Sequence, residues 1–97
     1  MAFVLSRTVT KTGNTTFFNV ANPAAVGRLK TWTLAQPGVL TTGVSAPNAN
    51  TQSGIIVFDT MENLNAFRTA RASNADFQAR EAYSQQNNFV VDETVIS

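Results

Sequence analysis

The chain has 97 residues, which predicts one domain over residues 1–97 with a single core; since so short a chain has a poor surface-to-volume ratio, burial in a homodimer would help it. The formal net charge is +1 and the seven cationic residues are scattered, so the basic stripe that binds nucleic acid is absent and we expect no nucleic-acid partner. Neither cysteine nor histidine occurs, which excludes thiolate chemistry and removes the commonest metal and haem ligand.

Residues 3–11 alternate in polarity, with Phe3, Leu5, Arg7 and Val9 on one face. This period of two predicts a strand. The Thr12-Gly13-Asn14 step predicts a turn, and the segment TTFFNVA after it is rich in strand-forming residues. The first strand therefore either folds back as a hairpin or continues irregularly, and both readings stay open.

The Asn22-Pro23 step is typical of a helix start, with Asn22 as N-cap and proline at the first helical position. We expect a helix over residues 23–36, ended by Pro37-Gly38. Its wheel places Trp32 on the flank of the buried face. The centre of that face consists of Val26, Leu29 and Thr33.

Two strands are expected next, over residues 39–46 and 54–59, around the polar loop PNANTQS. The run IIVF is apolar on both faces, which is typical of a central strand. The sequence Asp59-Thr60-Met61-Glu62 has the layout of a capping box, with Asp59 as N-cap of a helix that runs to Arg71.

Ser73-Asn74 offers a second cap, so we expect a break and a further helix to about Gln86, with Phe77 as its anchor and a small-residue face at Ala75, Ala79 and Ala82. The last segment, FVVDETVI, is a strand with Phe89, Val91, Glu93 and Val95 on one face.

The element order is therefore β-α-β-β-α-β. Right-handed crossovers place the first and third strands in the middle, with the fourth strand beside the first and the second beside the third. The predicted fold is the ferredoxin-like α+β plan, a four-stranded antiparallel sheet with both helices on one face. Its other face is expected to be substantially apolar, which favours a partner.

The residues that now stand out are Trp32, the step Gln36-Pro37-Gly38-Val39, the hairpin, and IIVFDTMENLNAF leading to ARASNADF. Over residues 23–96 the chain resembles the dimeric α+β barrel superfamily, which includes the antibiotic-biosynthesis-monooxygenase-like domains. Phe58 stands where tryptophan is common in that superfamily. The resemblance implies a homodimer with its two sheets face to face, and a ligand held between helices and sheet.

Members of the superfamily catalyse cofactor-independent oxygenation of aromatic polyketides and quinols, haem breakdown, or small isomerisations, and others have no known activity. This chain departs from them in its longer connection over residues 13–21. It also lacks the histidine of the haem-degrading members, which argues against haem chemistry.

Three polar or aromatic residues are candidate ligand-binding positions. Trp32 borders a cleft between helix and sheet or simply packs at the edge of the core. Asn19 either polarises a ligand carbonyl or forms hydrogen bonds with the backbone of its loop. Tyr83 either donates a proton or hydrogen bond to a ligand or is a partly exposed aromatic residue. For each residue the second reading is favoured.

Arg7 and Glu93 lie on otherwise apolar strand faces, where burial of either charge alone would be costly. If their strands are neighbours, the two pair. The pair then orients a ligand or fixes strand register and the dimer contact, and the structural role is favoured. Arg68, Arg71 and Arg80 read as a solvated helical surface, with anion binding as the lesser alternative.

Two functions follow as hypotheses. The first is a homodimeric small-molecule-binding protein, or a cofactor-independent monooxygenase-like enzyme, with an apolar pocket around Trp32 and an apolar or aromatic substrate. The alternative is a non-catalytic homo-oligomer that serves assembly. Catalytic residues stay unknown, and we expect no metal and no cofactor, because the carboxylates lack calcium-loop spacing. No segment resembles a secretory signal or a membrane span, so a cytoplasmic protein is expected.

Overall fold

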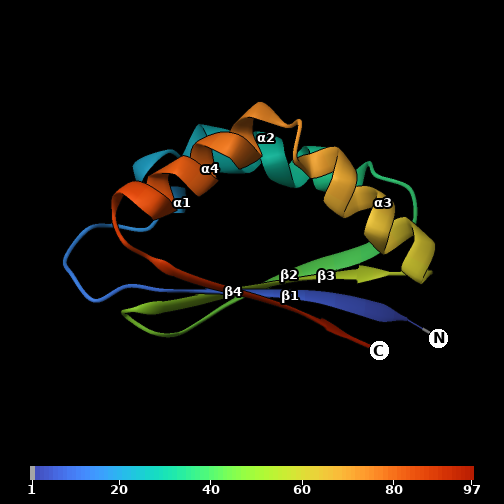
Figure 1. The fold of residues 1–97 in the computed structure, drawn as a ribbon, viewed down its shortest axis with the longest axis horizontal. Helices are drawn as coiled ribbons and strands as arrows, with labels where there is room; N and C mark the ends of the chain where they lie inside the picture. Colours follow the sequence, from blue (N-terminus) through green and yellow to red (C-terminus); the bar gives the residue numbers. More distant parts are fainter. Residues whose placement is uncertain (1) are drawn as a thin grey trace.

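The computed structural model describes residues 2–97. Its four strands and four helices form two layers, with the helices together on one face of the sheet and the other face open (Figure 1). The elements are β1 (Phe3–Thr10), α1 (Phe18–Ala21), α2 (Pro23–Leu34), β2 (Val39–Asn48), β3 (Thr51–Phe58), α3 (Met61–Arg71), α4 (Ala75–Gln86) and β4 (Val90–Ile96).

The sheet is antiparallel throughout, with the strand order β2-β3-β1-β4. The ferredoxin-like α+β fold and the predicted strand order are therefore confirmed. In the register, Leu5 lies opposite Ile56 of β3 and Val95 of β4, and Arg7 lies opposite Gly54 and Glu93. Because side chains alternate along a strand, these odd-numbered residues of β1 share the face that the helices cover.

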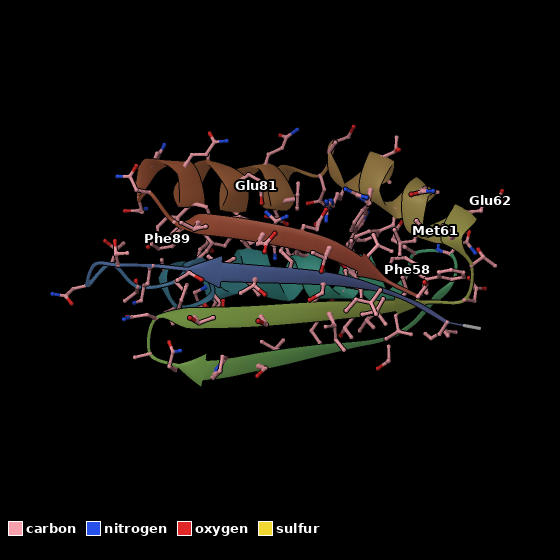
Figure 2. All side chains as sticks on the ribbon, turned by 60° about the horizontal axis from the view of Figure 1, so that its bottom comes forward. Phe58, Met61, Glu62, Glu81 and Phe89 are labelled. Atoms are coloured by element: carbon pink, nitrogen blue, oxygen red, sulfur yellow. The ribbon has the colours of Figure 1, made fainter. Side chains whose placement is uncertain are left out.

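The core lies beneath α3, where Leu5, Phe58, Leu64 and Phe67 form a buried cluster. The Phe67 ring lies 5.3 Å from Phe58 and 5.6 Å from Trp32, centroid to centroid. Phe58 and Leu64 are fully buried, which stabilises the fold by roughly 2–3 kcal/mol each. Figure 2 shows Phe58 near Met61 at one end of the sheet, with Phe89 at the other end.

Side-chain caps begin the three longer helices. Asn22 Oδ1 accepts a hydrogen bond from the Ala25 amide, and Asn74 Oδ1 accepts from Asp76 and Phe77, as the sequence indicated. At α3 the prediction of Asp59 as N-cap was wrong.

Thr60 caps α3 instead, because its hydroxyl accepts the Asn63 amide at 3.1 Å. The Asp59 carboxylate accepts from the Asn63 side-chain amide at 2.9 Å. The two adjacent acceptors thus bind the backbone and the side chain of the same asparagine.

Two segments contain more regular secondary structure than the sequence predicted. The loop PNANTQS was expected between shorter strands, but β2 and β3 extend to Asn48 and Thr51, with register shifts near Val39 and Ser45. The Asn48 side chain accepts the Asn50 amide at 2.9 Å, which closes a tight turn. Because β2 is an edge strand, Pro47 is tolerated in it.

The segment TTFFNVA was expected to be a hairpin strand or irregular. Residues 11–17 are irregular, so the hairpin reading was wrong and the irregular one holds as far as Phe17. The second half of the segment is the one-turn helix α1, which neither reading predicted. Phe18 is buried there and its ring lies 5.5 Å from that of Tyr83 on α4. Contact of an aromatic residue with a distant helix has outweighed local strand propensity.

The open face of the sheet is more polar than expected. Its apolar side chains include Val4, Ile55, Val57, Val90 and Ile96. Register places Ser6, Thr8, Ser53 and Thr94 beside them, with the Thr8 and Ser53 hydroxyls 3.0 Å apart. Over residues 2–97, none of the helices has both the length and the apolar character to cross a membrane.

Candidate functional site

A cavity of about 180 Å³ lies between the helices and the sheet. Its apolar wall is made by Leu5, Ile56, Val26, Leu29 and Phe67, which come from two strands and two helices. Two other lining residues, Lys30 on α2 and Val44 on β2, are exposed, so the cavity opens to solvent between these elements. Its inner end is charged.

The inner end contains a cluster of charged residues that we call the arginine cluster, namely Arg7, Arg71, Arg80, Glu81 and Glu93. Arg7 Nη1 lies 3.1 Å from Glu93 Oε1, and Arg71 Nη2 lies 2.7 Å from Glu93 Oε2. Arg7 Nη2 also pairs with Glu81. Figure 2 shows Glu81 on α4 above β4. The helical and strand layers are therefore joined by ion pairs at this place.

Phe77 is the platform of the arginine cluster. The guanidinium carbons of Arg7, Arg71 and Arg80 lie 5.4, 4.8 and 5.4 Å from the centroid of its ring. An aromatic face attracts a cation electrostatically, and more so where water is excluded. Phe77, which the sequence suggested as the anchor of α4, therefore also contacts three cationic side chains through its ring.

Arg80 is distinguished from the other two arginines by its lack of an anionic partner. Among residues 2–97 no carboxylate lies within ion-pair distance of it, and its buried Nε has no hydrogen-bond partner. Burial lowers the pKa of Arg80 to about 10, and the positive charges of Arg7 and Arg71 add to that effect. The site therefore contains one cation that is poorly compensated.

Glu93 is the common acceptor of the cluster, because Arg68 Nη2 also lies 3.2 Å from its Oε2. Burial by itself raises the pKa of Glu93. The hydrogen bond from Arg71 and the charges of Arg71 and Arg7 outweigh burial and hold the pKa of that carboxyl below its ordinary value. Burial lowers the pKa of Arg7, while Glu93 opposes that shift.

A second cavity of about 180 Å³ adjoins the first, since Arg7, Arg80, Val26, Val44 and Gly54 line both. The second cavity extends toward α1 and the start of β4, where its further lining residues include Phe17, Phe18, Asn19, Gln52, Ser84 and Phe89. Arg7 and Arg80 thus lie at the junction of two lobes.

Of the five residues suggested by the sequence, the structure brings Arg7 and Glu93 into the first cavity as the expected ion pair. Asn19 lines the second, where its side-chain oxygen accepts from Gln52 at 3.1 Å. The other two residues lie outside both cavities.

Trp32 packs against Phe67 at the edge of the core and does not line either cavity. The Tyr83 hydroxyl donates to the Thr16 carbonyl at 2.6 Å, and its ring lies between Phe18 and Phe89. Both residues therefore take packing positions, and ligand contact by either is still only a prediction.

The reading of Arg68, Arg71 and Arg80 as a solvated surface was wrong for two of the three. The Arg71 side chain is 12% exposed and the Arg80 Nε is buried, whereas the Arg68 side chain is 44% exposed. The signal that could have found Arg80 is the spacing of Phe77, Arg80 and Ser84, which share one face of α4. Apart from Phe77, this face holds little apolar surface. The helical wheel therefore drew attention to the small-residue face of Ala75, Ala79 and Ala82, and these alanines are exposed in the structure.

Over residues 2–97 no group of three or more acidic side chains is placed to hold a metal ion. The cavity instead combines an apolar wall with fixed guanidinium donors. Such an arrangement can exclude water from a ligand, orient it, and stabilise negative charge on it.

No protein-family profile matches the sequence, and no curated protein matches it significantly. Solved structures do share its fold. SnoaB, a cofactor-independent oxygenase from Streptomyces nogalater, superposes with a TM-score of 0.67 over 99% of this chain and 91% of SnoaB, at 10% identity.

Rv0793 from Mycobacterium tuberculosis gives a TM-score of 0.70 over 100% of this chain and 94% of its own, at 13% identity. A dimeric ferredoxin-like protein of unknown function from Thermobifida fusca gives 0.55 over 98% and 92%, at 12% identity. The resemblance expected from the sequence is thus confirmed at the level of the fold.

Proposed function

We propose that the protein is a homodimeric small-molecule-binding protein that acts as a cofactor-independent, monooxygenase-like enzyme on an apolar or aromatic substrate. The observation that carries this proposal is the cavity between helices and sheet, in which an apolar wall ends at the arginine cluster. Pockets that bind small molecules combine these two features. The similarity in fold to an oxygenase described as cofactor-independent supports the same reading.

The chemistry suits a chain without cysteine or histidine. An electron-rich substrate, such as a phenolate with an adjacent CH₂ group, can itself reduce dioxygen. The CH₂ becomes C=O, and the second oxygen atom leaves as water, so no external reductant is needed. The protein then supplies shape, exclusion of water and stabilisation of the substrate oxyanion, and guanidinium groups at the end of an apolar cavity suit the last of these tasks.

The homodimer is proposed from the open face of the sheet. Val4, Val57 and Ile96 form adjacent positions of one row across this face, and Ile55 and Ser6 occupy the next. A two-sheet contact would remove these apolar side chains from water. One structural neighbour is itself described as dimeric.

Native mass spectrometry of the protein purified without added ligand tests both parts. We expect a dimer, and an additional small mass wherever a ligand is retained. Ser6→Glu, which adds a charge to the middle of the open face, is expected to give monomers with an unchanged circular-dichroism spectrum, whereas Ser6→Ala remains dimeric. A wild-type monomer would contradict the homodimer.

Oxygen consumption distinguishes an enzyme from a binding protein. With an electron-rich dihydroxyanthrone as substrate, we expect protein-dependent uptake of dioxygen in the presence of a chelator. A dimer that binds no such compound and consumes no oxygen would favour the alternative, a non-catalytic assembly protein. The apolar row on the open face is the observation that supports this alternative.

A further inference from the structure

Arg80 is a half-buried cation with a buried Nε, and among residues 2–97 it has no anionic partner, whereas the other inward-facing arginines are paired. Arg7 has Glu81 and Glu93, and Arg71 has Glu93. Both Glu93 oxygens are engaged by other arginines, and no ion pair joins Glu93 to Arg80 among the described residues. A buried charge left without a partner is costly, and such groups are retained chiefly at functional sites.

The charges of the arginine cluster do not balance. Three guanidinium groups, Arg7, Arg71 and Arg80, face two carboxylates, Glu81 and Glu93. The three cations also lie against the same ring, that of Phe77. Arg68, which also pairs with Glu93, is 44% exposed and in contact with solvent. One further negative charge would neutralise the three inward-facing guanidinium groups, and among residues 2–97 no side chain supplies it.

The unpaired groups lie at the wall of the cavity. Arg80 lines both lobes, and the buried Nε atoms of Arg80 and Arg7 have no hydrogen-bond partner among the described residues. The planar fork of a guanidinium matches an oxyanion with two oxygens. At the mouth, the exposed Lys30 adds a further positive charge that would attract an anion.

We infer that the cavity binds an apolar molecule carrying one oxyanion, such as a carboxylate, which Arg80 binds at the junction of the two lobes. The inference rests on the proposed small-molecule function and names the chemical class of its ligand. The apolar body of the ligand lies against Leu5, Val26 and Leu29. A cavity of roughly 150 Å³ accommodates benzene, so lobes of about 180 Å³ each suit a body of one or two rings.

Calorimetric titration with two probes of matched shape tests this inference. The probes are 2-naphthoate, which carries the carboxylate, and 2-naphthalenemethanol, which is neutral. For the wild-type protein at pH 7.5 we expect 2-naphthoate to bind at least ten times more tightly. In Arg80→Gln this ratio is expected to fall to near one while the neutral probe binds as before.

Arg28→Gln is the matched control, because Arg28 is an exposed arginine paired with Asp76 on the outside of the helices. We expect its ratio to equal that of the wild type. Arg80→Lys retains the charge without the fork, and we expect an intermediate ratio, so the test survives if Arg80→Gln does not fold.

Each other outcome overturns the inference in an identifiable way. Equal binding of the two probes to the wild type would refute the oxyanion class and leave the apolar pocket standing. A preference for 2-naphthoate that persists in both Arg80 variants would refute the role of Arg80. If neither probe binds the wild type, the proposed small-molecule function fails together with the inference.

Discussion

Arg7 on β1 and Glu93 on β4 lie directly opposite each other in the sheet, and Arg7 Nη1 is 3.1 Å from Glu93 Oε1. Both side chains face the helices and are about equally buried, at 15% and 14% exposed. A slip of one residue between the strands would turn one of these charges to the open face and leave the other buried alone. The pair therefore specifies register and also forms part of the cavity wall.

Glu93→Gln is expected to destabilise the fold by roughly 3–5 kcal/mol, because removal of one member of a buried pair leaves its partners uncompensated. Here the partners are Arg7 and Arg71, with the more exposed Arg68 as a third. Urea denaturation measures the change, with Asp92→Asn as control on the same strand, where an exposed carboxylate without an ion pair should change stability by less than about 0.5 kcal/mol. Similar effects of the two substitutions would show that the Glu93 pairs contribute little.

The stability of the protein should fall on acidification, and Glu93 should account for a distinct part of the fall. The pKa of Glu93 is lower in the folded state than its ordinary value of about 4.3. Its stabilising contribution is therefore complete above that ordinary pKa and is lost as the pH falls through the lower, folded one. Thermal unfolding followed from pH 6 to pH 2.5 should show a steeper decline for the wild type than for Glu93→Gln. Parallel curves would contradict this account.

Arg80→Met should stabilise the unliganded protein by roughly 1–3 kcal/mol. Methionine retains much of the length of the side chain and removes an unpaired charge, a replacement that is often neutral or stabilising. Burial lowers the Arg80 pKa to about 10, which points in the same direction, since the charged form is disfavoured in the fold.

Chemical denaturation at pH 7 gives the difference in unfolding free energy for Arg80→Met. The control is Arg28→Met, at an exposed arginine, which should change that free energy by less than about 0.5 kcal/mol. A loss of stability in Arg80→Met would contradict this account. It would mean that contacts of the guanidinium, such as the one with Phe77, stabilise the fold by more than the unpaired charge destabilises it.

Gly38→Ala should destabilise the protein by at least about 1–2 kcal/mol. Gly38 has a φ of +79° after α2, a conformation that L-residues rarely adopt. A Cβ there would also lie 2.7 Å from the Cβ of Asn63 on α3. The matched control is Gly27→Ala within α2, where a Cβ meets no atom within 4 Å and alanine should stabilise the helix by roughly 0.5–1 kcal/mol. Melting temperatures of the two variants should therefore shift in opposite directions.

Much of the fold could be read from local patterns. The period-two strands, the caps at Asn22 and Asn74, and the Pro37-Gly38 step were sufficient to predict the element order, because each depends on residues within a few positions of one another. The strand order then followed from the handedness of the crossovers. The Arg7–Glu93 pair could be predicted because register follows once these two strands are neighbours.

The other residues of the site could not be predicted from local sequence patterns, for a physical reason. Arg71 and Arg80 carry charged side chains, and charge on a helix normally indicates a solvated face. Their inward orientation depends on Phe77, on Glu93 of a strand distant in the sequence, and on an opening between α2, α4 and the sheet that no local pattern encodes. The helical turn at Phe18 likewise depends on Tyr83, which is far away in the chain.

The sequence by itself thus determined the order of the longer helices and strands and the ferredoxin-like topology, since capping, periodicity and crossover handedness are properties of short segments and of chirality. Only the tertiary structure decided where the cavity lies and which charges face it. The energy of a buried charge depends on the partners that the whole fold places around it, and Arg80 lacks an anionic partner only in that context.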